Sequence, residues 1–339
     1  MTTIRDVAKR CGVSAMAVSA VLNNRPGKVS PETRARVRLA VEEMGYQPNA
    51  IARGLTRRRM NTLGIVLCFR GTVPVTSDRY FSPILDGIFV ANKIHHQRSL
   101  IIAEDNFGDV EQNIPSYLDG HCDGLVFVVP VLPVEAYQTL VKRRMPFVVI
   151  GETVPDDLVS VSDVDNVLAG YDATTYLIEN GHRRIGLLKG QEFLFSSGLR
   201  EIGFRKAMQE NGLACDESQI IPGSYSELSG FDRTLMLFGK PNNSRPTALF
   251  CEDDAIAIGA WKAVKQLGLR VPQDVSLIGV NDDRGLFTDE TALTTIRQPF
   301  RMIGEKAIEM TLALVNGEEP GSKALSRGDL MVRNSVAHV

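Results

Sequence analysis

Cationic side chains gather at the amino-terminal end of this chain. Residues 1–60 contain 12 Lys and Arg against 4 Asp and Glu, a net charge of +8, whereas the remaining 279 residues carry 26 basic and 36 acidic groups, a net charge of −10. Guanidinium and ammonium groups at this density can neutralise phosphates, so the basic end predicts a polyanionic partner. A basic surface that only faces solvent would give the same count.

Residues that could do covalent or metal chemistry are not arranged for it. The sequence has no Gly-rich phosphate loop, H-E-x-x-H or G-x-S-x-G motif, and no C-x-x-C pair. We therefore expect no catalytic residue, no metal ligand and no cofactor. A cysteine nucleophile is the alternative, but no motif pairs a His with one. The cysteines, which we interpret as reduced and mostly buried thiols, are Cys11, Cys68, Cys122, Cys215 and Cys251.

Length and composition indicate a globular protein of several domains. The chain has 339 residues, enough for two or three domains, with 44% hydrophobic and 23% charged residues. No apolar run reaches the roughly 18 residues that span a bilayer. Arg5, Asp6, Lys9 and Arg10 stand where a signal peptide would need its apolar core. These features predict a cytoplasmic protein with no membrane partner.

Three short helices are predicted in residues 1–46. Thr3, Ser14 and Ser30 can cap their amino-terminal ends, while Gly12 and Gly45 can end the first and the third. The apolar positions expected to share inward faces are Ile4, Val7, Ala8 and Cys11, then Val18, Val21 and Leu22, then Val37, Ala40, Val41 and Met44. The positions expected on the outward face of the second helix are Met16, Ser19, Ala20 and Asn23.

Two short helices joined by a tight turn and braced by a third match the helix-turn-helix plan, although three small helices are also a common packing module. The residue types at successive positions of this region favour the helix-turn-helix interpretation. It resembles the head of the LacI/GalR repressor family over residues 3–8, 11–14, 18–19, 21–23, 29–30, 33–34, 37, 45–49, 52–53 and 55. The resemblance implies a DNA-binding domain over residues 1–46, followed by a hinge helix and linker over residues 47–61.

The same resemblance implies which residues touch DNA. Ala15, Met16 and Ala20 stand at base-reading positions where relatives often carry hydrogen-bonding side chains, so we expect apolar reading of DNA shape and thymine methyl groups. Residues expected to hold phosphates are Ser14, Ser19, Asn23, Thr33 and Arg34. Residues expected to contact DNA from the hinge are Asn49, Ala52 and Leu55, with the leucine wedged into the minor groove. A plain linker is the alternative for the hinge.

From residue 62 onward, short β-branched runs alternate with helical stretches, which predicts two doubly wound parallel sheets. The expected strands are residues 63–67, 100–103, 124–129, 147–150, 185–188, 248–250 and 275–280. The expected helices of the later part lie near residues 167–180, 199–211, 228–238, 254–267 and 301–316. The fold class is therefore an all-α helix-turn-helix head followed by an α/β body.

The family resemblance continues through the body, over residues 165–166, 181–185, 200, 203–204, 245–248, 254, 257, 259, 268–276 and 293–299. It implies a type I periplasmic-binding-protein-like fold over residues 62–339, in which the chain crosses between two lobes three times. Lobe one is expected at about residues 62–161 and 293–323, and lobe two at about residues 162–292 and 324–339. A ligand is expected in the cleft, at the carboxyl ends of the strands.

Carried over position by position, the family's ligand-binding residues are Tyr80 and Phe81 on lobe one, and Arg200, Tyr225, Asp253 and Asn281 on lobe two. The guanidinium is expected to offer a bidentate fork, the aromatic rings to cover apolar faces, and the Asp and Asn to bind hydroxyl groups. Structural roles are expected for Asp165, His182 and Asp282.

Two departures leave the ligand open. Asp253 stands where the family usually has Asn, and Asn281 where it usually has Asp. Residues 71–79 also lack the family's usual Asn-Pro, with Asp78 and Arg79 in their place.

These observations predict a sequence-specific DNA-binding transcriptional regulator, a repressor controlled by a small molecule such as a sugar or related metabolite. A homodimer reading a near-palindromic double-stranded site is expected, because no heptad segment follows the body. The alternatives are a receptor that only delivers sugar and an enzyme. The basic head argues against the first, and the missing catalytic motifs argue against the second.

Overall fold

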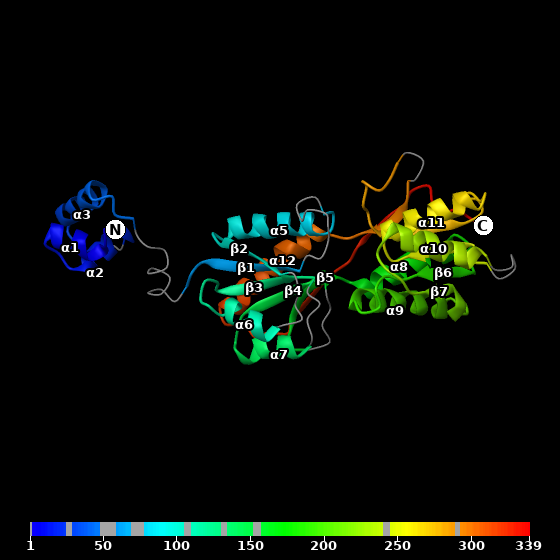
Figure 1. Cartoon of the computed structure of the whole chain (residues 1–339), viewed down its shortest axis with the longest axis horizontal. Helices are drawn as coiled ribbons and strands as arrows, with labels where there is room; N and C mark the ends of the chain where they lie inside the picture. The colour runs from blue at the N-terminus through cyan, green and yellow to red at the C-terminus, as the bar shows by residue number, and fades with distance from the viewer. Residues whose placement is uncertain are drawn as a thin grey trace. The chain divides into compact units, whose positions relative to one another are not determined.

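The computed structural model describes residues 2–24, 29–47, 59–68, 78–104, 110–129, 134–151, 157–239, 245–288 and 292–339. The chain forms two compact units, Met1–Asn61 and Thr62–Val339 (Figure 1). We call the first unit the head and the second the body.

The head contains three helices, α1 (Ile4–Cys11), α2 (Ala15–Leu22) and α3 (Pro31–Glu43). Each begins at a predicted cap, because a side-chain oxygen of Thr3, Ser14 or Ser30 accepts a backbone N–H of the first turn. Asp6 completes a capping box by accepting the Thr3 N–H at 2.8 Å. Gly12 ends α1 in the left-handed conformation, at φ 63°.

The apolar faces of the three helices form one small core. Its buried members are Val7, Ala8, Cys11, Val18, Val21, Val37 and Ala40. The prediction that Ala20 lies on the outward face is wrong, because this side chain is only 6% exposed. Its methyl group extends a single carbon from the helix, so longer neighbouring side chains can cover it. Met16 on the same helix is 77% exposed.

The body contains two six-stranded sheets, and these define two lobes. Lobe one has the strand order β11-β5-β4-β3-β1-β2 and is parallel throughout. Lobe two has the order β12-β10-β9-β8-β6-β7, with β12 antiparallel at one edge. The predicted fold class is therefore confirmed.

The strands of lobe one are β1 (Thr62–Cys68), β2 (Arg98–Glu104), β3 (Gly124–Val128), β4 (Phe147–Ile150), β5 (Ser160–Val164) and β11 (Lys323–Ser326). The strands of lobe two are β6 (Ile185–Leu188), β7 (Ile220–Ile221), β8 (Ala248–Cys251), β9 (Ser276–Asn281), β10 (Thr294–Arg297) and β12 (Asp329–Met331).

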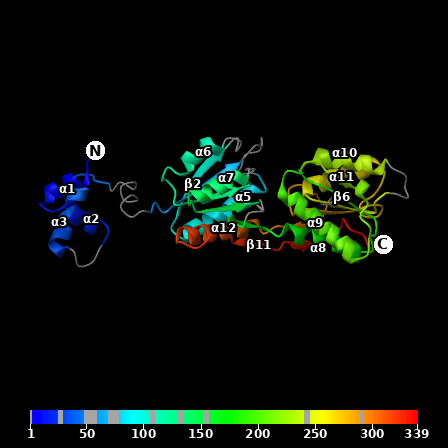
Figure 2. The same cartoon turned by 90° about the horizontal axis from the view of Figure 1, so that it is seen from below.

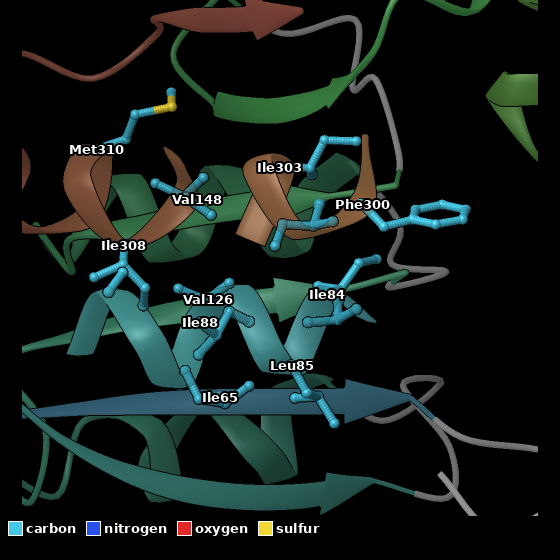
Figure 3. Close-up of a cluster of buried hydrophobic side chains, with 14 of the residues drawn as sticks. Ile65, Ile84, Leu85, Ile88, Val126, Val148, Phe300, Ile303, Ile308 and Met310 are labelled. Carbon is cyan, nitrogen blue, oxygen red and sulfur yellow. The ribbon is translucent and has the colours of Figure 1, made fainter. Parts of the chain in front are cut away.

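Helices cover both faces of each sheet (Figure 2). In lobe one they are α5 (Phe81–Ile94) and α12 (Phe300–Val315) on one face, and α6 (Val110–Tyr117) and α7 (Val134–Lys142) on the other. In lobe two they are α8 (Asn166–Glu179) and α9 (Phe195–Glu210) on one face, and α10 (Glu227–Phe238) and α11 (Asp254–Gln266) on the other. Figure 3 shows how Val126 and Val148 of the lobe-one sheet meet Ile88 of α5 and Ile308 of α12 in one cluster.

Glycines allow the helices to pack in close pairs. A Cβ added at Gly203 of α9 would lie 2.0 Å from the carbonyl oxygen of Val167, and one added at Gly170 of α8 would lie 2.1 Å from that of Arg200. The two backbones are therefore in contact. The pairs α5 with α12 and α10 with α11 use glycines in the same reciprocal way.

The chain passes between the lobes after β5, after β10 and after β11. These crossings lie a few residues beyond the positions expected near residues 161, 293 and 323. The expected boundaries were displaced because β5, β10 and β11 are short and carry polar residues, so their sequences do not predict buried strands.

Candidate functional site

A cavity of about 920 Å³ in the body is lined by residues that follow strands of both lobes. Its size is typical of small-molecule sites, and its place at the carboxyl ends of parallel strands is the usual one for α/β sheets. The lining includes all the residues predicted for the cleft: Tyr80, Phe81, Arg200, Tyr225, Asp253 and Asn281.

Lobe one supplies an aromatic wall. Asp78 Oδ1 accepts the backbone N–H groups of Tyr80 and Phe81 at 2.9 and 3.0 Å, which fixes the turn that begins α5. The Tyr80 ring packs edge-on against Phe300, with centroids 4.9 Å apart. A Cβ added at Gly151 would lie 2.2 Å from the Tyr80 hydroxyl, so the ring lies directly against that backbone.

Arg200 on α9 is 5% exposed and largely committed to the protein. Its Nε donates to Asn166 Oδ1 at 2.9 Å, and its Nη1 donates to the Glu252 carbonyl oxygen at 2.5 Å. Among the described residues, no hydrogen bond engages Nη2. These two bonds leave Nη2 and the second N–H of Nη1 for a ligand, so the bidentate fork stays a prediction.

Asp253 and Asn281 are bonded to each other. Asp253 caps α11 by accepting the Ala255 N–H at 2.7 Å, and its second oxygen accepts Asn281 Nδ2 at 2.6 Å. Asn281 Oδ1 in turn accepts Gln298 Nε2 at 2.6 Å. Burial raises the pKa of Asp253 to about 6, although these hydrogen bonds favour the carboxylate. The hydrogen bond between positions 253 and 281 needs one carboxylate and one amide, whichever position carries each. This explains how the two residue types can be exchanged.

Tyr225 lies against the backbone of Gly190 on the lobe-two side of the cavity. A Cβ added at Gly190 would fall 2.1 Å from its ring carbons, and its hydroxyl lies 3.4 Å from Ser196 Oγ. Burial raises the pKa of Tyr225 to about 12, so the side chain stays a neutral phenol. It can therefore cover an apolar face and still donate a hydrogen bond.

Among the cavity-lining residues that were not predicted as ligand residues is a buried acid. Asp163, at the end of β5, is 2% exposed. Its carboxylate accepts the Val164 N–H at 2.8 Å and the Asn166 amide at 3.3 Å. Burial raises the pKa of Asp163 to about 7. The only signal for a buried acid here was a segment in which polar residues, Asp163 among them, alternate with valines, and this segment is too polar for its sequence to predict a strand.

Two more buried acids, Glu252 and Asp254, flank Asp253. Glu252 Oε2 accepts Ser197 Oγ at 2.6 Å and the Gly190 N–H at 2.7 Å, while its Oε1 is buried and has no hydrogen-bond partner in the part of the chain that the structure describes. Burial raises the pKa of Glu252 to about 7 and raises that of Asp254 well above its usual value. The run of three acids directly after an apolar strand was visible in the sequence but was not singled out as a buried group.

The residues given structural roles do serve structure. Asp165 caps α8 by accepting the Leu168 N–H at 2.8 Å. His182 is 1% exposed, its ring nitrogens lie within 3.0 Å of two hydroxyl groups, and burial lowers its pKa. Asp282 accepts Arg297 Nε at 2.7 Å and also accepts Arg333 Nη2.

An ion pair links the two lobes at the cavity. Arg79 Nη1, just before α5, lies 2.5 Å from Asp283 Oδ1, just after β9. A Cβ added at Gly285 would collide with the Arg79 guanidinium, so glycine leaves the space that the arginine occupies.

In the head, the predicted DNA-contacting residues of α2 and α3 differ in availability. Met16 is largely exposed, whereas Asn23 Nδ2 donates to the Ser19 carbonyl at 2.7 Å and its hydroxyl at 3.3 Å. Thr33 and Arg34 are half-buried. The predicted hinge residues Asn49, Ala52 and Leu55 lie outside the described residues. The DNA contacts themselves stay predictions.

The chain was compared with known families, proteins and structures. Residues 3–49 match the family described as bacterial regulatory proteins, lacI family, and residues 174–336 match a periplasmic binding protein-like domain. The HTH-type transcriptional repressor PurR of Shigella sonnei (strain Ss046) is 36% identical over 344 residues, which cover 99% of this chain and 97% of that protein. PurR of Serratia proteamaculans (strain 568) is 34% identical, with the same coverage.

Two solved structures extend the comparison. One is a complex of the transcriptional regulator CelR with cellobiose, with a TM-score of 0.72, 28% identity and coverage of 99% of this chain and 100% of that one. The other is the lac repressor dimer bound to operator and the anti-inducer ONPF, with a TM-score of 0.79, 25% identity and coverage of 99% of both chains. Within the described ranges, no helix has the length and apolar character needed to cross a bilayer.

Proposed function

The chain belongs to the LacI family of bacterial regulatory proteins, and from this premise we propose that it is a transcriptional repressor whose operator affinity is set by a small molecule bound between its lobes. The observation that carries the proposal is the joining, in one chain, of a capped three-helix head and a cavity that all the predicted ligand residues line. A receptor that only delivers ligand has no use for such a head. A cytoplasmic location follows from this role.

We propose that residues 1–46 bind DNA through α2, with residues 47–61 as hinge and linker. The net charge of +8 in residues 1–60 supplies the sequence-independent attraction to phosphates. The exposed Met16 side chain on α2 supplies an apolar group for the major groove. Two copies of the chain would read a near-palindromic site, and the lac repressor forms such a dimer on its operator.

We further propose that the ligand couples the cavity to the head by changing the relation between the lobes. It would touch the aromatic wall of lobe one, including Tyr80 and Phe81, and the polar residues of lobe two, including Arg200 and Asp253. A ligand that binds one arrangement of the lobes better than another shifts the population toward it. A dimer would transmit that shift to the spacing of its two hinges, and either sign of coupling is possible.

The structure supports binding in the cavity better than it supports turnover. The acids that line it are engaged as helix caps or by neighbouring amides, as Asp253 and Asp163 illustrate. CelR, solved as a complex with cellobiose, and the curated PurR relatives are regulators by their names. We therefore propose that the ligand is a sugar or related metabolite, and that it is bound and released without chemical change.

The test is a selection of duplex DNA from the source genome with the purified full-length chain, followed by fluorescence anisotropy on the recovered sites. We expect near-palindromic sites whose affinity falls by about 10³-fold or more between low and moderate salt, as counterion release requires. A metabolite panel should then contain compounds that change this affinity. Absence of duplex binding at low salt, with and without the panel, would refute the proposal.

A further inference from the structure

Arg233 of α10 is a buried arginine that does not line the cavity. It is 7% exposed, and within the residues that the structure describes no carboxylate lies at ion-pair distance from its guanidinium. Burial lowers the pKa of Arg233, so keeping the charge in this place costs free energy. The guanidinium uses four of its five N–H donors on backbone carbonyl oxygens. Nε donates to Ser229 at 2.8 Å, Nη1 to Lys189 at 2.5 Å and to Ile221 at 2.9 Å, and Nη2 to Ser224 at 3.3 Å.

These carbonyl oxygens belong mainly to two loops at the carboxyl edge of the lobe-two sheet. Lys189 directly follows β6, Ile221 ends β7, and Ser224 lies in the turn before α10. The strands β6 and β7 are neighbours in the sheet, so one guanidinium holds the chain where both of them end. A Cβ added at Gly223 would lie 2.5 Å from Arg233 Cζ. Glycine at this position therefore leaves the space that the guanidinium fills.

The same two loops carry Tyr225 and the backbone against which its ring lies. Gly190 follows Lys189, and a Cβ added at Gly190 would lie 2.1 Å from ring carbons of Tyr225. Tyr225 itself follows Ser224. Arg233 thus holds both the residue before the ring and the residue before the backbone that supports the ring.

We propose that Arg233 is a positioning residue, which fixes the ring of Tyr225 in the cavity wall before any ligand enters. A wall that already has its bound arrangement spares the ligand the free energy of ordering it. Lysine could not take this role, because its ammonium group is a point charge, whereas the planar guanidinium reaches four separate carbonyl oxygens at once. The proposal rests on the proposed function only in taking the cavity as the ligand site.

The first measurement follows Tyr225 by ¹⁹F NMR in the full-length chain labelled with 3-fluorotyrosine, with no ligand added. The chain has 7 tyrosines, and the resonance that Tyr225→Phe removes is assigned to Tyr225. In Arg233→Lys this resonance should move at least halfway toward its position in the urea-unfolded chain, while the other tyrosine resonances stay in place. Arg233→Met, which lacks all the donors, should move it at least as far.

Arg333→Met provides the matched control. Arg333 is another arginine of lobe two that donates to backbone, from Nη1 to the Leu293 carbonyl oxygen at 2.6 Å, but it bonds neither loop beside Tyr225. This variant should lower the unfolding free energy without moving the Tyr225 resonance. Chemical denaturation measures the loss in each variant, and circular dichroism checks that the fold is kept.

The second measurement is amide hydrogen exchange of the same proteins, again with no ligand added. In Arg233→Lys, peptides that cover residues 189–193 and 222–228 should exchange about 10-fold or more faster than in the wild type, as expected when the hydrogen bonds that hold a loop are lost. A peptide that covers residues 276–281, the strand β9 of the same sheet, should exchange at the wild-type rate.

A Tyr225 resonance that stays in place in Arg233→Lys, or that moves as far in Arg333→Met, would overturn the proposal, as would unchanged exchange in the two loops. If Arg233→Met does not fold, Arg233→Lys alone decides. Duplex DNA binding by the wild-type chain separates the two proposals. A chain that binds operator but whose Tyr225 does not respond to Arg233 disproves only the positioning role, whereas a chain without affinity for DNA disproves only the repressor.

Discussion

The two lobes have six-stranded sheets with equivalent strand orders, yet they line the cavity with different kinds of side chain. Lobe one presents aromatic rings that pack against its apolar core, among them Tyr80 and Phe81. Lobe two presents buried charged groups whose hydrogen bonds go to amide side chains and to backbone, among them Arg200 and Asp253. The fold thus determines where a cleft forms, whereas the few residues after each strand determine what it can hold. Single substitutions in the two lobes should therefore differ in how much they change the unfolding free energy and the affinity for the ligand.

The largest effect should come from Arg200→Ala in lobe two. Removing this guanidinium leaves Asn166 Oδ1 and the Glu252 carbonyl oxygen buried without their donor, and it removes the cation that favours the carboxylate forms of Asp163, Glu252 and Asp253. The loss should be about 3–5 kcal/mol of unfolding free energy. The matched control is Arg205→Ala on the same helix, which pairs with Glu217 and Glu201 at the partly exposed surface and should cost about 1 kcal/mol or less. Chemical denaturation at neutral pH measures both. A loss no larger than that of the control would show that lobe two does not depend on this charge.

The next effect is the pH dependence contributed by Glu252. Its folded pKa of about 7 lies above the unfolded value, so its contribution to stability is full below the unfolded pKa and is lost as pH rises toward 7. Glu252→Gln removes this loss. The unfolding free energy of the variant minus that of the wild type should therefore rise by about 2–3 kcal/mol from about pH 4.5 to about pH 8. A flat difference across that range would contradict a neutral buried carboxyl group.

Helix packing in lobe two gives a third comparison, between two glycines of α9. Gly203→Ala places a methyl group 2.0 Å from the Val167 carbonyl oxygen and should cost about 1–3 kcal/mol. Gly198→Ala meets nothing within 4 Å and should instead stabilise the helix by up to about 1 kcal/mol. Thermal unfolding of the two variants should therefore move in opposite directions. Movement in the same direction would indicate that α8 and α9 are not in backbone contact.

The smallest effect tests the link between the lobes. A double-mutant cycle of Arg79→Ala and Asp283→Asn should give a coupling of about 0.5–1 kcal/mol, because Arg79 is half exposed. The same cycle on Arg301 and Glu305, an ion pair within one helix, provides the control. Ligand affinity should respond to the first cycle only. If ligand affinity responded to both cycles, the effect would come from the change in overall charge and not from the ion pair that links the lobes.

The head was predictable because its signals are local. Thr3, Ser14 and Ser30 act on N–H groups only a few residues away, so their roles can be found in the sequence without knowledge of the tertiary structure. Ala20 was predicted wrongly because coverage of a methyl group depends on larger neighbours. Long apolar strands such as β3 and β4 were also predictable, since near-continuous hydrophobicity marks a strand covered on both faces.

The cavity was only partly predictable. The family resemblance brought together residues that do line one cavity, such as Arg200 and Tyr225. It could not reveal that Arg200 is committed to protein partners, because Asn166 and Glu252 reach it only through tertiary packing. Asp163 was missed for a similar reason. No local pattern distinguishes an acid that will be buried from one that will be solvated, since only the assembled sheet excludes the water.

Asp282 has a mechanical consequence. One carboxylate holds Arg297, directly before the second passage between lobes, and Arg333, shortly after the third. The lobe-two ends of two connecting segments are thereby tied to one carboxylate. A displacement of one connection should therefore be passed to the other, so that the two respond together when a ligand changes the relation between the lobes.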